Sequence, residues 1–143
     1  MDTNIRSIAL NRCVEEKSAI TPRRMLIIES LFKQQKPISA YELKEYLNEI
    51  GEQLNIATIY RVLGFWCTLG LAHRISSINK FVSCSDPEEK HTHIINYCKI
   101  CESTVESCHK KMGIDIASGA EFLGLTLATD IHLEVPVFCE SCG

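Results

Sequence analysis

Three amphipathic segments follow one another in the first half of the chain. Thr21 offers a capping hydroxyl directly before Pro22, and apolar residues then recur at helical spacing, which predicts a helix to about residue 33. Ser39, with Glu42 shortly after it, has the pattern of a capping box and predicts a second, shorter helix that ends at Gly51. Each helix has one apolar face, so we expect both to pack against a shared core.

A third helix is predicted to begin near Asn55. Its apolar face is formed by Ile59, Val62, Leu63, Trp66 and Leu69. With that face buried, Ala57 and Arg61 turn outward, and Thr58 and Tyr60 lie on the flanks. An outward arginine has the fork geometry that reads guanine or binds phosphate in DNA, whereas Tyr60 can also be explained as half-buried packing.

After Gly70 the hydrophobic pattern changes from helical to alternating. Residues 71–75 and 80–84 are predicted to be two strands around a polar turn at 76–79. Three helices followed by a hairpin are typical of a winged helix-turn-helix, whose last helix enters the major groove of DNA.

The second half of the chain begins after the best candidate for a linker, a polar, charged segment that contains a proline. Beyond it, strand patterns occur at 91–97, 103–106 and 131–138, and a weak helical pattern occurs at 112–123. We therefore predict an α+β protein with an N-terminal winged helix-turn-helix domain at 1–84, a hinge at 85–90 and a small α/β domain at 91–143.

Charge and cysteine content narrow the class of protein. Residues 1–74 hold ten Lys or Arg against eight Asp or Glu, and residues 75–143 hold five against ten, which weakly favours a DNA contact in the first half.

Without an export signal or an apolar run long enough to span a bilayer, we expect a cytoplasmic protein outside the membrane. Eight cysteines in that reducing compartment indicate metal thiolates rather than disulfides. No enzyme motif such as a P-loop is present, so we do not expect an enzyme.

Two Cys-x-x-Cys pairs are present, Cys98 with Cys101 and Cys139 with Cys142. Each pair offers two thiolates from one tight turn, and two such turns complete the tetrahedral coordination that zinc prefers. A site closed by four thiolates stabilises the fold rather than performing catalysis. Buried free cysteines or a redox dithiol would not require a second pair of equal spacing. Glu102 is unusual here, because glycine is common directly after such a turn.

A second group of metal-binding residue types lies around the linker. If the hairpin turns about residues 78 and 79, His73 lies directly opposite Cys84, close enough to share an ion. His91 and His93 alternate onto one face of the next strand, and Glu106 follows on the strand after it. A mixed cysteine, histidine and carboxylate set suits zinc, although surface histidines would give the same pattern without a metal. A third, weaker site stays open at Cys108, His109 or His132.

Several of these segments resemble one known family. Residues 21–24, 39–43 and 57–63 resemble the DNA-binding half of the ferric uptake regulator superfamily, and the paired cysteine motifs resemble its dimerisation half. The branch that looks most similar is the zinc uptake regulators, on the order of His73, Cys84, His91, Cys98, Cys101 and Glu106. Ile94 and Ile95 stand where iron-sensing and peroxide-sensing members carry histidine and acidic residues.

The resemblance implies a zinc-responsive repressor of zinc uptake genes that binds double-stranded operator DNA as a homodimer. It implies two Zn²⁺ ions per subunit and selects His91 over His93, so that the regulatory ligands are His73, Cys84, His91 and Glu106. Tyr60 and Arg61 are expected to reach bases or phosphates, with Tyr41 and Arg24 helping to seat the domain on DNA.

Regulatory ligands from both sides of the linker suggest how zinc acts. An ion shared between the wing and the second domain would fix their angle, and only a fixed angle spaces two recognition helices to meet successive major grooves. Two alternatives stay open. One is a sister sensor of iron, manganese or peroxide, and the other is a zinc-binding interaction module or enzyme that does not touch DNA.

Overall fold

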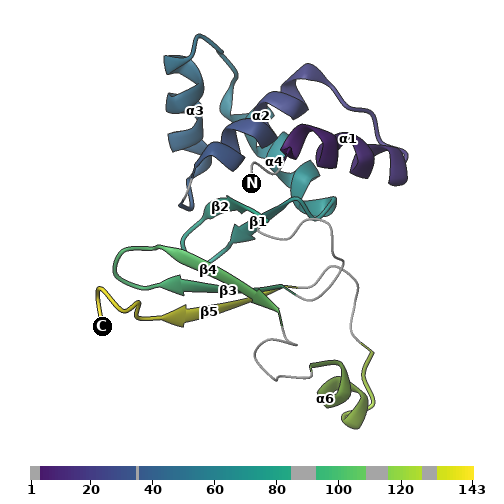
Figure 1. Cartoon of the computed structure of the whole chain (residues 1–143), viewed down its shortest axis with the longest axis vertical. Helices are drawn as coiled ribbons and strands as arrows, with labels where there is room; N and C mark the ends of the chain where they lie inside the picture. Colours follow the sequence, from purple (N-terminus) through teal and green to yellow (C-terminus); the bar gives the residue numbers. More distant parts are fainter. Residues whose placement is uncertain (1–3, 35, 85–92, 109–115, 127–131) are drawn as a thin grey trace. The chain divides into compact units, whose positions relative to one another are not determined.

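The computed structural model describes residues 4–34, 36–84, 93–108, 116–126 and 132–143. The chain divides into two compact units, Met1–Glu88 and Glu89–Gly143. A helical first unit and a second unit built on a three-stranded sheet confirm the predicted α+β class (Figure 1). The predicted hinge at 85–90 and His91 lie outside the described residues. Within the described ranges, no helix has the length and apolar character needed to cross a membrane.

Four helices lie in the described residues of the first unit. They are α1 (Ile5–Glu15), α2 (Pro22–Lys33), α3 (Ala40–Glu49) and α4 (Ile56–Thr68). The side chains of Thr21, Ser39 and Asn55 accept hydrogen bonds from backbone N–H groups in the first turns of α2, α3 and α4. Ser39 and Glu42 make both hydrogen bonds of a capping box. These hydrogen bonds confirm the three predicted helix starts. The starts can be predicted from the sequence because a cap depends on residues within one turn of each other.

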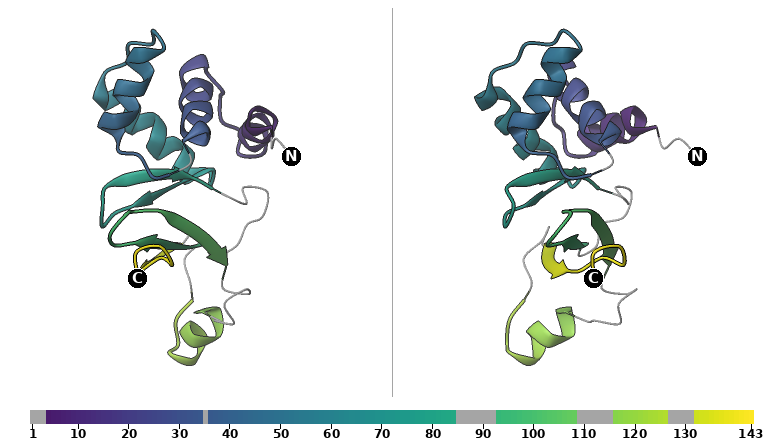
Figure 2. Two further views of the ribbon diagram at one scale, coloured as in Figure 1. Left: turned by 60° about the vertical axis from the view of Figure 1, so that its left-hand side comes forward. Right: turned by 90° about the vertical axis from the view of Figure 1, so that its left-hand side faces the viewer.

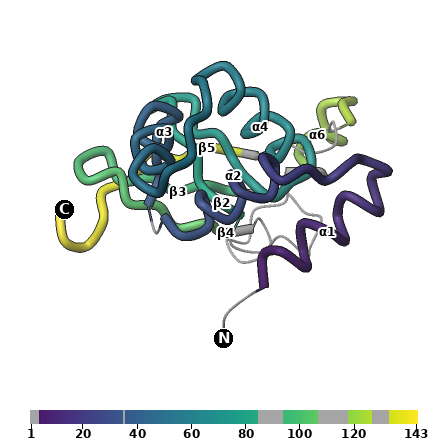
Figure 3. Tube along the Cα trace, turned by 90° about the horizontal axis from the view of Figure 1, so that it is seen from above, coloured from purple at the N-terminus to yellow at the C-terminus, as the bar shows by residue number. Residues whose placement is uncertain are grey.

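Helix α1 is the element whose packing the sequence pattern did not predict. Ile5, Ala9 and Cys13 recur every fourth residue and are buried, so one face of α1 joins the core of the first unit beside α2 (Figure 3). The buried Arg12 guanidinium donates a hydrogen bond to the carbonyl oxygen of Leu69, directly after α4. Helix α1 therefore holds the C-terminal end of α4 through a charged hydrogen bond as well as through apolar packing.

Strands β1 (Ala72–Ile75) and β2 (Lys80–Ser83) form the predicted hairpin, but the predicted register is wrong. His73 pairs with Val82, and Cys84 lies just beyond β2. The turn spans residues 76–79 and is centred one residue earlier than we assumed, with Asn79 in the left-handed conformation at φ 49°. This error moves each cross-strand partner by two positions. His73 and Cys84 therefore stay on one face of the hairpin, as diagonal rather than direct neighbours.

The second unit is built on a sheet in the order β4–β3–β5 (Figure 1). The strands are β3 (His93–Cys98), β4 (Thr104–Cys108) and β5 (His132–Val137). Strand β3 is antiparallel to β4 and parallel to β5. Helix α6 (Ile116–Phe122) lies apart from these strands (Figure 2). Ile94 and Ile95, on the central strand, are both buried.

Candidate metal sites and nucleic-acid interface

The two Cys-x-x-Cys turns lie at the same edge of the second unit's sheet. Cys98 ends β3, and Cys139 follows shortly after the end of β5. Because β3 and β5 are parallel, with Cys98 in register with Val137, both strands leave the sheet at one edge. The structure thereby brings together all four predicted sulfur ligands. The Sγ atoms of Cys98, Cys101, Cys139 and Cys142 all lie within 4.8 Å of one another.

The thiol pKa values reflect this crowding. Backbone N–H groups of Cys101, Cys139 and Ile100 point at Cys98 and lower its pKa to about 6. Hydrogen bonds to the sulfurs of Cys139 and Cys101 raise the pKa of Cys142 to about 12. Four sulfurs at this spacing cannot all carry negative charge unless a cation lies among them, and Zn²⁺ meets that condition with the matching tetrahedral geometry. The donor set therefore fits a structural zinc ion.

His73 and Cys84 form a second pair of metal-binding side chains, within the first unit. They are 6% and 2% exposed, and their ligand atoms lie within 4.8 Å of each other. The proximity arises from the diagonal arrangement in the hairpin rather than from direct pairing. A buried imidazole beside a buried thiol can offer one nitrogen and one sulfur ligand to a single ion.

The remaining predicted ligands belong to the second unit. Glu106 lies on β4 and is half-buried. His93 begins β3, and the backbone register places Cys108 and His132 next to it on the neighbouring strands. His91 and His109 lie outside the described residues.

Helix α4 presents the polar face that the sequence predicts. Ala57 and Arg61 are exposed, and Tyr60 is half-buried. The Tyr60 ring makes edge-to-face contacts with the rings of Tyr41 in α3 and Phe81 in β2, at centroid distances of 6.3 and 6.2 Å. Tyr41 is itself exposed. The two tyrosine rings form an aromatic surface between α3 and α4, with a polar hydroxyl on each ring, and Tyr60 packs on the buried Phe81 of the hairpin.

Arg24, the remaining residue predicted to help bind DNA, lies at the junction of α2 and α4. Its guanidinium carbon is 3.8 Å from the centroid of the Phe65 ring. Its backbone carbonyl accepts a hydrogen bond from the indole nitrogen of Trp66 at 2.8 Å. Sequence reasoning did not identify Phe65, whose contact with Arg24 joins distant parts of the chain. The sequence feature that could have identified Phe65 is its position one helical turn after Arg61, on the same side of the helix.

A winged helix with an exposed arginine on its last helix, joined in one chain to a four-cysteine sheet, defines a metal-binding regulator of the DNA-binding class. The model of the ferric uptake regulator family matches residues 15–127. This chain belongs to the ferric uptake regulator family. Membership confirms the resemblance predicted from the sequence, and with it the expected class of protein, a regulator rather than an enzyme.

Similar proteins include regulators of zinc uptake. The zinc uptake regulation protein of Escherichia coli (strain K12) is 28% identical over 131 residues, which cover 91% of this chain and 76% of that protein. A structure of a zinc uptake regulator complexed with zinc and DNA has a TM-score of 0.80 at 26% identity, and the match covers 99% of this chain and 95% of that one. The crystal structure of holo XcZur has a TM-score of 0.73 at 28% identity, with 92% and 91% covered.

Proposed function

We propose that this protein is a zinc-responsive repressor, which binds operator DNA as a homodimer in the cytoplasm and silences zinc uptake genes when zinc is plentiful. The observation that carries the proposal is the buried pair of ligands in the wing, His73 and Cys84. These ligands belong to the same hairpin that borders the predicted recognition helix. The similarity to a zinc uptake regulator complexed with zinc and DNA, across 99% of this chain, supports zinc as the metal and DNA as the partner.

One zinc ion would be held by Cys98, Cys101, Cys139 and Cys142. Four thiolates leave no open coordination position, so the ion supplies a cross-link and no catalytic chemistry. The cross-link would join the ends of β3 and β5, which are distant in sequence but parallel neighbours in the sheet. Metal binding at such a site contributes directly to folding of the second unit.

A second zinc ion would be held by His73, Cys84, His91 and Glu106, which makes two ions per subunit. A thiolate and an imidazole together are softer ligands than those that usually bind iron(II) or manganese(II). These residues come from both units, so they can all reach one ion only in a restricted set of arrangements. Zinc would favour those arrangements because it would bind them more tightly than the others. A restricted arrangement would hold two recognition helices at the spacing of successive major grooves.

Two buried isoleucines favour zinc over the alternative signals within the family. Ile94 and Ile95 are each 1% exposed and occupy the central strand of the sheet. At these positions the resemblance leads us to expect histidine and acidic ligands in iron and peroxide sensors. Apolar side chains offer no ligand atom, so a histidine-rich and carboxylate-rich site of that kind is incomplete in this chain.

The DNA-binding surface would be the exposed face of α4 together with the aromatic surface beside it. Arg61 is exposed and would read a base or bind a phosphate. Tyr60 and Tyr41 would contribute their hydroxyl groups and ring faces, with Arg24 supporting the helix from its contact with Phe65.

Self-association would use the second unit, where large apolar side chains are exposed. They are Ile100, Val105, Phe122, Leu123, Leu125, Leu133 and Phe138. Exposed apolar side chains in such number are typical of a surface that another protein covers. A second copy of the chain is the partner that a homodimeric repressor requires.

The function is tested by measuring DNA binding as the metal is varied. DNA is selected from a randomised pool with zinc-loaded protein, and fluorescence anisotropy then gives its affinity with zinc, iron(II), manganese(II) or a chelator. We expect zinc to strengthen binding about tenfold or more, and the affinity to fall steeply with salt because phosphate contacts release counterions. Tighter binding with iron(II) would indicate the sister sensor. No salt-dependent binding under any metal would indicate a module that does not touch DNA.

Cysteine variants separate the two metal sites in the same assay. We expect Cys84→Ser to keep the wild-type melting temperature and dimer but to lose the zinc-dependent part of DNA binding. Cys98→Ser should lower the melting temperature or dissociate the dimer. Cys67→Ala is the matched control, because burial raises the pKa of Cys67 to about 11 and keeps it a protonated thiol. Intact zinc-dependent binding in both site variants would contradict this division of roles.

A further inference from the structure

Arg23 and Arg24 are adjacent in the first turn of α2, and the structure gives them different surroundings. Both carry one positive charge, and the sequence alone does not distinguish solvated charge from a role in binding. Arg24 is half-buried, whereas Arg23 is exposed. The two side chains therefore have different environments although they are neighbours on one helix.

Arg24 joins three segments of the first unit. Its guanidinium lies over the Phe65 ring at 3.8 Å and donates a hydrogen bond to the carbonyl oxygen of Ala19, in the segment that joins α1 to α2. Its backbone carbonyl accepts the Trp66 indole N–H, and Trp66 is fully buried. A guanidinium stacked on an aromatic face and bonded to a carbonyl has little freedom to turn toward a ligand.

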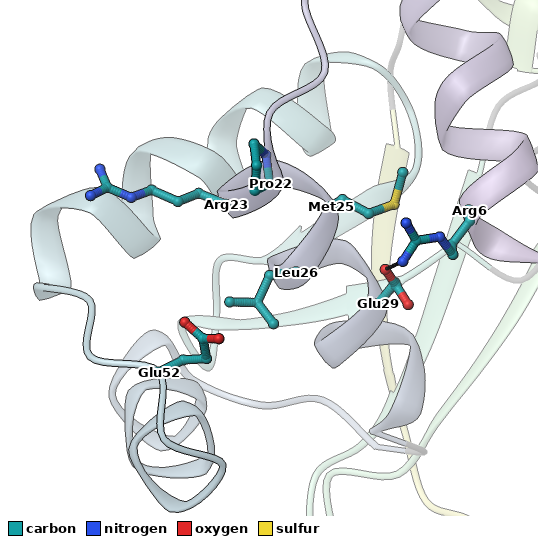
Figure 4. Close-up of a pocket in the computed structure, with 7 residues that line it drawn as sticks. All are labelled: Arg6, Pro22, Arg23, Met25, Leu26, Glu29 and Glu52. Atoms are coloured by element: carbon teal, nitrogen blue, oxygen red, sulfur yellow. Dashed lines mark hydrogen bonds and ion pairs between the residues drawn. The ribbon is translucent and has the colours of Figure 1, made fainter.

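Arg23 has none of these attachments. No hydrogen bond or ion pair involves it within the part of the chain that the structure describes. In Figure 4 it borders a shallow pocket whose other side holds the Arg6–Glu29 ion pair, with a nitrogen to oxygen distance of 2.7 Å. The Arg23 guanidinium points away from that ion pair and away from the pocket. Its charge is therefore directed outward rather than neutralised by Glu29.

The position of Arg24 also places Arg23 relative to the face of α4 predicted to meet DNA. Phe65 follows Arg61 by four residues, so the two side chains are neighbours on one side of α4. Because Arg24 stacks on Phe65, the start of α2 borders the same side of α4 from which Arg61 projects. A phosphate backbone that lies along α4 would pass the start of α2, where Arg23 is the exposed cation.

We propose that the two arginines have separate roles, with Arg23 as a phosphate contact and Arg24 as a positioning residue that fixes α4 against α2. This inference rests on the proposed DNA-binding function and deepens it. Arg24 acts on DNA binding only through Phe65 and the placement of Arg61. Arg23 acts on it only through charge, without discrimination among DNA sequences.

The test compares Arg23→Gln with Arg24→Gln in the full-length, zinc-loaded protein. Both variants lose one positive charge, so each is the control for the other. Affinity for a short mixed-sequence duplex is measured across a range of salt concentrations, because phosphate contacts bind any sequence. We expect Arg23→Gln to reduce the slope of log affinity against log salt by about 1 and to leave the melting temperature unchanged. Arg24→Gln should lower the melting temperature and keep the wild-type slope.

A double-mutant comparison separates positioning from a general loss of stability. Phe65→Leu removes the ring on which Arg24 stacks. The melting temperature and affinity losses of Phe65→Leu and Arg24→Gln should then be strongly non-additive, because both remove one contact. The losses of Phe65→Leu and Arg23→Gln should add. Arg24→Lys, which keeps a cation near the ring, should recover part of both losses.

Two results would overturn the inference. One is a reduced salt slope in Arg24→Gln with an unchanged melting temperature, and the other is a wild-type slope in Arg23→Gln. Failure of the proposed function would look different, because the wild-type protein itself would then show no salt-dependent binding to any duplex.

Discussion

At the scale of single residues, the backbone after the first cysteine pair is strained. Glu102 has φ 62°, in the left-handed region that costs a residue with a side chain about 1 kcal/mol. Its N–H donates to the carbonyl oxygen of Cys98 at 2.9 Å, which closes the turn that carries Cys101. The absence of glycine at this position is visible in the sequence, and the positive φ shows that the turn nevertheless adopts the conformation that glycine favours.

The strain at Glu102 predicts a stabilising substitution. Glu102→Gly should raise the free energy of unfolding of the zinc-loaded protein by up to about 1 kcal/mol, because glycine adopts this conformation without steric cost. Glu102→Ala is the control, since alanine removes the carboxylate but keeps the Cβ atom, and it should give no gain. Chemical denaturation with zinc present measures both. A loss of stability in the glycine variant would show that the Glu102 side chain outweighs the backbone strain.

At the scale of elements, the start of α3 combines a cap with an ion pair. Burial alone would raise the pKa of Glu42, but hydrogen bonds from the Ser39 side chain and backbone, and the charge of Lys80, together lower it. The Nζ atom of Lys80 in β2 lies 3.5 Å from Glu42 Oε1. The capping box thereby connects α3 to the hairpin as well as to its own first turn.

The lowered pKa of Glu42 predicts a pH dependence with a definite sign. A group whose pKa is lower in the folded than in the unfolded state stabilises the fold above its unfolded value, and the stabilisation disappears as the pH falls through the folded value. Glutamine can still complete a capping box, so Glu42→Gln removes the charge alone. The stability difference between wild type and Glu42→Gln should be largest near neutral pH and should vanish in acid. A difference that stays constant across that range would contradict the charged role.

The sequence predicts some elements better than others for a physical reason. The starts of α2, α3 and α4 are set by caps at Thr21, Ser39 and Asn55, which act within one turn. The hairpin register depends on where the turn is centred, and an error of one residue there moved the partner of His73. The parallel pairing of β3 with β5 joins distant segments, so no local pattern predicts it.

At the scale of the whole molecule, the candidate sites are divided between two units. The chemistry of the four-cysteine site can be predicted from spacing alone, because each pair is local and the ion requires both. The contact between Arg24 and Phe65 cannot be predicted in this way, since Phe65 lies on another helix. The regulatory ligands can be predicted from the sequence only in part. Sequence order and residue type identify His73 and Cys84, but their diagonal placement follows from the hairpin geometry.

We expect zinc at the site containing His73 and Cys84 to control the affinity for DNA. Coupling between two ligands is reciprocal, so DNA must strengthen zinc binding by the factor with which zinc strengthens DNA binding. The most direct measurement is a competitive zinc titration of the protein that already holds its structural ion, with and without DNA selected by the zinc-loaded form. We predict equal factors for the wild-type protein, and no effect of DNA on zinc affinity in Cys84→Ser. A wild-type zinc affinity that is the same with and without DNA would contradict it.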